Sequence, residues 1–312
     1  MVDITDHPGF LYCCKKQGCD VIVLPMTFLE GISKNTRYIE DRLAVLYDND
    51  RHFGFKPIVL QLIGKKIEAI KDVFNILSSY EIQGVNLNMG CPSGRIKAQG
   101  LGASILDRPK DRDAVIDAVL KSSPVPLSIK MRLFGKEKSD VPASISFCKM
   151  LETKGIDWVA VHGRTGRQRY TGPADWNAIK EIHEATSLPL VGNGDITCWN
   201  HGKRLVDEGS CDAFMIGRAA WKDPRVFSHS YNTAAVKTMA DALVLFREIT
   251  GFVIANRGHH LEPLLVSHEI RKVAVALSRQ VRGGKKFRDR AVKASTIDEI
   301  EALFVSIQGT SR

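Results

Sequence analysis

The sequence predicts a (β/α)8 barrel of the TIM type followed by a small helical domain. Three observations predict this fold: short apolar runs alternate with helical patterns up to about residue 228, most of these runs are continuously apolar, and only helical patterns follow them. Continuous apolar runs are typical of parallel strands that are buried on both faces. We therefore expect a barrel at 1–233 and a helical domain at 234–312.

The alternation of strands and helices supports the barrel segment by segment. We expect strands at 20–24, 57–63, 84–89, 127–133, 158–162, 188–193 and 213–216. Helical patterns lie between them at 65–79, 110–122, 143–154, 174–186 and 199–208. This spacing is typical of βα units in a parallel sheet.

The first helical pattern, at about 8–17, comes before the first predicted strand. In a (β/α)8 barrel each helix follows a strand. We therefore expect the first strand of the barrel to be missing upstream of Met1. An open parallel sheet is the alternative.

The last third of the chain carries a basic segment between predicted helices at 234–256, 261–281 and 297–307. The net charge of the chain is +9, and Asp289 is the single acid between positions 271 and 293. Clustered Lys and Arg residues favour a polyanionic partner. We expect RNA contacts here from Arg271, Lys285, Lys286 and Arg288. The alternative is a solvated charged helix.

Composition excludes several other classes of protein. No apolar run reaches the length of a membrane span, and the N-terminus lacks the layout of a signal peptide. The seven cysteines include no Cys-x-x-Cys pair. We therefore expect a cytoplasmic protein with neither a disulfide framework nor a metal site.

Polar side chains occur at the ends of six successive predicted strands. The carboxyl ends of parallel barrel strands share one rim, where active sites lie. Such a set is difficult to explain as packing, so we predict a site there. Its candidate residues are Gln61, Asn88, Cys91, Lys130, Arg132, His162, Arg164, Asn193, Gly194, Asp195, Gly217 and Arg218.

The last two strand ends are rich in glycine, in the segments 191–195 and 216–218. Glycine lets a backbone approach a phosphate closely, and an arginine can add charge-assisted hydrogen bonds. A phosphate there, with Lys130 and His162 toward the barrel centre, suits flavin mononucleotide. Ordinary turn glycines are the alternative.

Six motifs in order resemble the tRNA-dihydrouridine synthase family. They are Asn-Leu-Asn-Met-Gly-Cys-Pro-Ser (86–93), Lys-x-x-Gly-x-Gly-Ala-Ser-Ile-Leu (97–106), Ser-Ile-Lys-Met-Arg (128–132), Val-His-Gly-Arg-Thr (161–165), Gly-Asn-Gly-Asp-Ile (192–196) and Met-Ile-Gly-Arg-Ala (215–219). The resemblance covers residues 1 to about 228, and the helical tail is compatible with the RNA-binding domain of the family.

The resemblance implies an FMN-dependent oxidoreductase that reduces the C5–C6 bond of selected uridines in tRNA, with NADPH (or NADH) reducing the flavin. It implies that Cys91 protonates C5, that Asn88 orients the uracil and that Arg164 contacts RNA or substrate. It assigns the flavin to Gln61, Lys130, His162, Asn193, Gly194, Asp195, Gly217 and Arg218. The alternatives are a small-molecule FMN oxidoreductase of the dihydroorotate or dihydropyrimidine dehydrogenase type and a non-catalytic RNA-binding protein.

Overall fold

The computed structural model describes residues 7–37, 39, 40, 43, 56–231, 238–257 and 263–308. The chain forms two compact units. One contains Val21–Ala44 and Lys56–Gly217, and the other contains Met1–Asp20, Val45–Phe55 and Arg218–Arg312.

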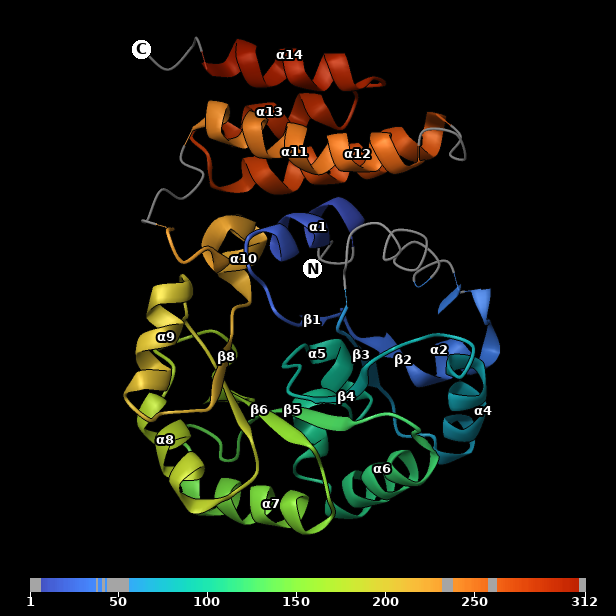
Figure 1. Ribbon diagram of the computed structural model, residues 1–312, viewed down its shortest axis with the longest axis vertical. Coiled ribbons are helices and arrows are strands. Elements are labelled where there is room, and N and C mark those ends of the chain that lie inside the picture. Colours follow the sequence, from blue (N-terminus) through green and yellow to red (C-terminus); the bar gives the residue numbers. More distant parts are fainter. Residues whose placement is uncertain are drawn as a thin grey trace. The chain divides into compact units, whose positions relative to one another are not determined.

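The first unit is built on a parallel sheet that curves like a barrel wall (Figure 1). Its strands pair in the order β1-β3-β4-β5-β6-β7-β8, and β2 pairs with β3 beside this path. Every pairing is parallel. The strands are β1 (Ile22–Val23), β2 (Thr27–Phe28), β3 (Ile58–Ile63), β4 (Gly84–Met89), β5 (Leu127–Leu133), β6 (Trp158–Thr165), β7 (Leu190–Asn193) and β8 (Ala213–Met215).

Helices surround the outer face of this sheet (Figure 1). They are α2 (Leu29–Lys34), α4 (Ile67–Leu77), α6 (Pro109–Ser122), α7 (Val141–Thr153), α8 (Trp176–Ala185) and α9 (Trp199–Asp207). Every residue of β3 is buried, because helices cover one of its faces and the barrel interior covers the other. The prediction of a TIM-type α/β fold is therefore confirmed.

Local sequence explains where several helices begin. The Asp140 carboxylate accepts a hydrogen bond from Ala143 N at 3.0 Å, and the Asp175 carboxylate accepts one from Ala178 N at 2.9 Å. These bonds satisfy N–H groups of α7 and α8 that have no partner inside the helix.

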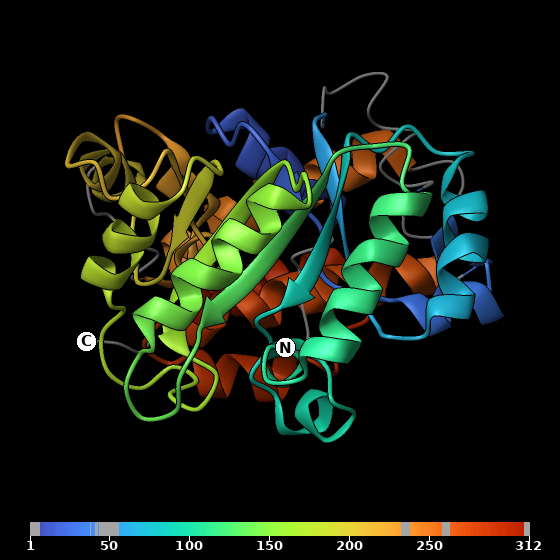
Figure 2. The ribbon, with the colours of Figure 1, turned by 90° about the horizontal axis from the view of Figure 1, so that it is seen from below.

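The carboxyl ends of the strands lead into the loops that carry the predicted site. The short helix α5 (Gly94–Ala98) and the 3-10 turn at Gly102–Ile105 follow β4 and lie beyond these ends (Figure 2). Active sites of such barrels lie in the loops at this edge.

Sequence and structure differ mainly at the first strands. β4 and β5 have the predicted bounds, whereas β1 has two residues instead of five and β2 was not predicted. Two-residue strands are too short to produce a recognisable pattern. Within the described residues β8 does not pair with β1, so the sheet is open between them.

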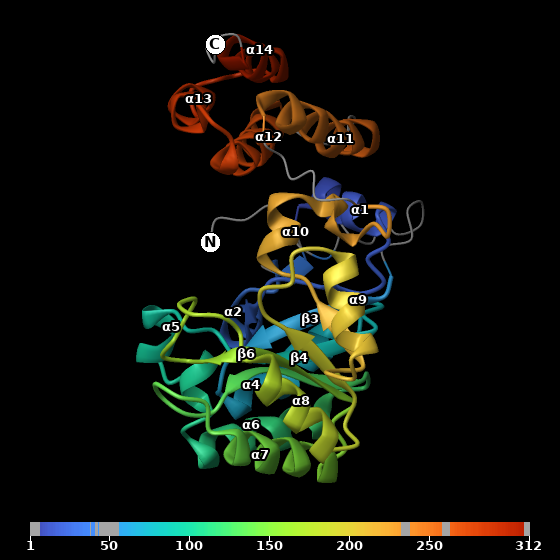
Figure 3. The ribbon, with the colours of Figure 1, turned by 90° about the vertical axis from the view of Figure 1, so that its left-hand side faces the viewer.

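The second unit is helical. It contains α1 (Pro8–Lys16), α10 (Arg218–Lys222), α11 (Met239–Arg257), α12 (Pro263–Leu277), α13 (Gly284–Ala291) and α14 (Ile297–Gln308) (Figure 3). The helix α1 packs on α11, where the Tyr12 and Phe252 rings stack with their centroids 4.3 Å apart. The predicted domain boundary at 233/234 stays a prediction, although α1 and α10 group here with the C-terminal helices.

The basic segment contains a helix that the sequence analysis left unassigned. α13 buries Gly284, Phe287 and Ala291 and exposes Lys285 and Lys286. Only three small or aromatic positions mark its inner face, so the charged residues mask the helical pattern. None of the helices among the described residues has the length and apolarity that crossing a membrane requires.

Candidate functional site

Strand register gathers the predicted side chains on the inner face of the sheet. Along one strand, residues two apart share a face. On β4 these are Asn86 and Asn88, and on β5 they are Ser128, Lys130 and Arg132. Asn88 pairs in register with Lys130, Arg132 with His162, and His162 with Asn193. The structure therefore brings the site residues of β4 to β7 together.

A chain of amide hydrogen bonds crosses three strands below the rim. Asn86 Nδ2 donates to Ser128 Oγ at 2.9 Å, and Gln61 Nε2 donates to Asn86 Oδ1 at 2.7 Å. Asn88 Nδ2 then donates to Gln61 Oε1 at 2.8 Å. Asn86 and Ser128, which the sequence analysis did not assign to the site, are both buried. Buried amides need such partners, and here the partners fix their orientation.

Asn88 connects this hydrogen-bonded chain to the loop of Cys91. Its Oδ1 accepts hydrogen bonds from Gly90 N at 3.1 Å and Cys91 N at 3.0 Å. The Cys91 side chain is half-buried and packs against an apolar cluster of Ile63, Ile96 and Leu101. The oxygen of Asn88 is thus committed to the loop, and the predicted contact of this residue with uracil stays a prediction.

A glycine closes the loop of Cys91 from the other side. Gly102 has a φ of +59°, and a Cβ atom added to it would lie 2.5 Å from Cys91 O and 2.9 Å from Cys91 Cβ. Ala103 N also donates to Cys91 O at 3.0 Å. Only glycine combines this backbone conformation with so close an approach.

We expect Gly102→Ala to lower the free energy of unfolding by about 1–3 kcal/mol, because it adds strain and a steric clash. Gly94→Ala, at the first residue of α5 in the same β4–α6 connection, is the control, since its added Cβ meets nothing within 4 Å. Urea unfolding of both variants measures the difference. Equal stability of the two variants would contradict this account of the loop.

Lys130 and Asn193 join β5 to the last strands. Lys130 Nζ donates to Asn193 Oδ1 at 2.8 Å, and Asn193 Nδ2 donates to Met215 O at 2.8 Å. Burial, with a smaller contribution from the Arg132 charge, lowers the pKa of Lys130 to about 7. No carboxylate within the described residues forms an ion pair with this ammonium group.

Arg164 lies inside the protein. Its side chain is 3% exposed, and its Nη2 lies 2.6 Å from Asp195 Oδ2. The same Nη2 donates to Gly172 O at 2.7 Å, and its Nη1 lies 3.1 Å from His162 Nε2. A guanidinium group can only donate, so Nε2 accepts and the ring is in the Nδ1–H tautomer. The predicted contact of Arg164 with RNA or substrate stays a prediction.

Arg132 is a residue of the rim to which the sequence analysis gave no role. It is 1% exposed, and its Nε donates to Gly90 O at 2.8 Å. Its Nη1 donates to Thr165 O at 3.0 Å and to Arg169 O at 2.6 Å. One side chain thus joins the Cys91 loop to the β6–α8 loop. Its position two residues after Lys130 was the available signal.

The two glycine-rich strand ends differ in their surroundings. Gly194 has a φ of +130°, and an added Cβ would lie 2.6 Å from Ala174 Cβ. At Gly217 an added Cβ would meet nothing within 4 Å. Arg218 begins α10 in the second unit, and its predicted phosphate contact stays a prediction.

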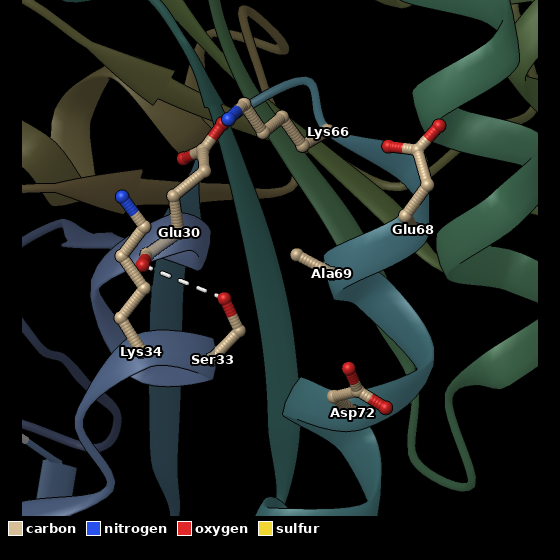
Figure 4. Close-up of a pocket in the computed structure, with 7 residues that line it drawn as sticks. All are labelled: Glu30, Ser33, Lys34, Lys66, Glu68, Ala69 and Asp72. Atoms are coloured by element: carbon tan, nitrogen blue, oxygen red, sulfur yellow. Dashed lines mark hydrogen bonds between the residues drawn. The ribbon is translucent and has the colours of Figure 1, made fainter.

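A separate pocket of about 240 Å³ lies between α2 and α4. It is lined by Glu30, Ser33, Lys34, Lys66, Glu68, Ala69 and Asp72 (Figure 4). None of the predicted site residues lines it. Three of the lining residues are acids and two are lysines. Among the described residues, no group of three His, Cys, Asp or Glu side chains is arranged to hold a metal ion.

The fold is that of an α/β barrel protein, and the strand-end residues form a candidate site at the carboxyl ends of its strands. The family model described as "Dihydrouridine synthase (Dus)" matches residues 1–306. The chain therefore belongs to the dihydrouridine synthase family, and the resemblance seen in the motifs is confirmed. Membership of this family implies that the protein is an oxidoreductase.

Several bacterial proteins are similar to this chain. A probable tRNA-dihydrouridine synthase of Rhizobium leguminosarum bv. phaseoli is 30% identical over 72% of the chain and 68% of its own length. The tRNA-dihydrouridine synthase B of Pseudomonas aeruginosa is 29% identical, over 73% of the chain and 66% of its own length. A probable tRNA-dihydrouridine synthase of Aquifex aeolicus is 26% identical over 94% of the chain and 90% of its length.

Among solved structures, histamine dehydrogenase from Rhizobium sp. 4-9 is similar in fold. It has a TM-score of 0.56 at 13% identity and covers 99% of this chain and 60% of its own. At this identity the likeness concerns the fold alone.

Proposed function

We propose that this protein reduces the C5–C6 double bond of uridines in tRNA, with FMN as cofactor and NADPH or NADH as reductant. Family membership and the names of the relatives support the reaction class and the tRNA substrate. The observation that carries the proposal is the convergence of Cys91, Lys130 and Asn193 at one barrel edge, with Asn88 ordering the cysteine loop.

The residues of the rim fit a flavin. When bound there, FMN would provide hydride chemistry toward C6 of the uracil. The half-buried Lys130 ammonium forms no ion pair with a carboxylate of the described residues, so its charge suits the negative charge of a reduced flavin ring. The conformation of Gly194 and the open space at Gly217 suit close approach of a phosphate. We propose that Gln61, Asn193, Gly194, Asp195, Gly217 and Arg218 complete this site.

The role that we propose for Cys91 is proton donation to C5. The S–H group of a cysteine can donate a proton directly, without a separate activating base. The two N–H bonds to Asn88 and the close approach of Gly102 hold the backbone of Cys91 in place. The loop therefore holds the proposed proton donor, Cys91, in a fixed position relative to the uracil.

The exposed basic residues of the helical unit suit the RNA backbone. Lys285 and Lys286 lie on the outer face of α13. Arg288 Nη1 donates to Ser278 O at 3.2 Å, and Arg271 Nη1 donates to Ala294 O at 3.3 Å, so these two arginines also brace the unit. We propose that the four residues bind tRNA phosphates.

The lowered pKa of Lys130 predicts a pH dependence of stability in flavin-free protein. Between about 7 and the ordinary value of 10.5, the unfolded state binds a proton that the folded state lacks. The free energy of unfolding should therefore rise with pH across this window. Urea unfolding from pH 7 to pH 10 measures the rise, and Lys130→Met should flatten it. The same slope in the variant would exclude Lys130 as its source.

The proposed function is tested with purified protein and unmodified tRNA. The protein should be yellow, and with NADPH it should convert uridine to dihydrouridine, as nucleoside mass spectrometry detects. A colourless protein that binds tRNA would favour the non-catalytic alternative. A yellow protein that reduces free pyrimidines and leaves tRNA unmodified would favour the small-molecule enzyme.

A further inference from the structure

An exposed aromatic ring lies beside the cysteine loop. Tyr170 is 50% exposed, and among the described residues it is the one aromatic side chain in the group of exposed large hydrophobic residues. Its ring centroid lies 5.5 Å from the guanidinium carbon of Arg132. Arg132 Nε donates in turn to Gly90 O, one residue before Cys91. The ring therefore lies near the reactive edge of the barrel.

The loop that carries Tyr170 is held firmly. Arg132 Nη1 donates to Arg169 O at 2.6 Å, and Thr165 N donates to Gln168 Oε1 at 2.7 Å. A Cβ atom added to Gly166 would lie 2.9 Å from Ala103 Cβ, so this loop touches the segment that follows Cys91. An exposed ring on a fixed backbone can bind a flat ligand with little loss of conformational entropy.

The surroundings of the ring are basic. Lys136, Lys138, Arg167 and Arg169 are exposed in the β5–α7 and β6–α8 loops. Thr165 Oγ1 donates to Lys136 O at 2.6 Å, which joins the two loops. Glu137 is the neighbouring acid, and its carboxylate pairs with Arg167 Nε at 2.9 Å. Lys136, Lys138 and Arg169 form no ion pair with a carboxylate within the described residues.

We infer that Tyr170, with Lys136, Lys138 and Arg169, forms a binding surface for single-stranded RNA, on which an unpaired base next to the target uridine stacks. An aromatic face surrounded by cations is the arrangement that binds unpaired nucleotides. That the RNA is tRNA rests on the proposed function. This surface belongs to the barrel unit, whereas α13 belongs to the helical unit.

The test compares Tyr170→Phe with Tyr170→Leu in the full-length protein. Both residues are apolar and of similar size, but only phenylalanine can stack. With unmodified tRNA as probe, fluorescence anisotropy should show binding close to wild type for the Phe variant and on the order of tenfold weaker for the Leu variant. The salt dependence should be the same in both, because a tyrosine releases no counterions. Equal affinity of the two variants would overturn the inference.

The cations have their own test. Arg169→Ala should lower the slope of log affinity against log salt by about one. Lys121→Ala, on the exposed end of α6, is the matched control and should leave the slope unchanged. Because binding requires no turnover, the two proposals are separable. If the Leu variant loses affinity for tRNA but the wild type forms no dihydrouridine, only the proposed activity is excluded. If the wild type forms dihydrouridine but the Leu variant binds tRNA with full affinity, only this binding surface is excluded.

Discussion

Cys91→Ala should reduce dihydrouridine formation by about 10²–10⁴-fold, the usual contribution of a positioned general acid. The half-buried side chain packs against Ile63, Ile96 and Leu101, and its removal leaves the backbone bonds to Asn88 in place. Bound flavin and affinity for tRNA should therefore stay close to wild type. Nucleoside mass spectrometry, flavin absorbance and tRNA binding measure the three quantities separately.

Cys198→Ala is the matched control for this variant. Cys198 is also a half-buried free thiol, and it precedes α9 in the loop after β7. It should retain full activity. If Cys91→Ala forms product at the wild-type rate, the proton comes from another group and the proposed role of Cys91 is wrong.

Arg132→Met should have the second large effect. The variant keeps an unbranched apolar side chain but loses the hydrogen bonds to the carbonyl oxygens of Gly90, Thr165 and Arg169. Hydrogen bonds to a charged group contribute about 1.5–3 kcal/mol each, so we expect the free energy of unfolding to fall by at least about 3 kcal/mol. Urea unfolding measures this change.

A second measurement separates loop position from general stability. Under native conditions, the rate at which iodoacetamide alkylates Cys91 should change in Arg132→Met, while the rate at Cys198 should not. Arg95→Met, at an exposed position of α5, is the control for loss of a positive charge. Wild-type alkylation of Cys91 together with wild-type stability would show that Arg132 does not hold the loop.

The sequence predicts the barrel well where one physical signal dominates. β4 and β5 carry an apolar residue at every second position, and their predicted bounds agree with the structure. β1 is shorter than the strand predicted at 20–24, and the two-residue strand β2 gives no such signal. α13 has a pattern that its charged residues mask, so that only the packing of Phe287 and Ala291 reveals it.

The site residues could be predicted as a set but not by their contacts. Polar residues at strand ends identify the rim, yet the partners of each side chain come from distant segments. Arg164 resembles an exposed cation in the sequence, but it meets Asp195, 31 residues further along the chain. Arg132 donates to backbone carbonyl oxygens of the loops. Every residue has such an oxygen, so the residue types do not indicate these bonds.

The amide chain from Ser128 to Asn88 contains no ionisable group, so acid or alkali cannot alter its donors and acceptors. The geometry that it imposes on Cys91 should thus be the same when Lys130 is charged and when it is neutral. The turnover rate measured as a function of pH would then report the protonation of the reacting groups, without a contribution from rearrangement of this hydrogen-bonded chain.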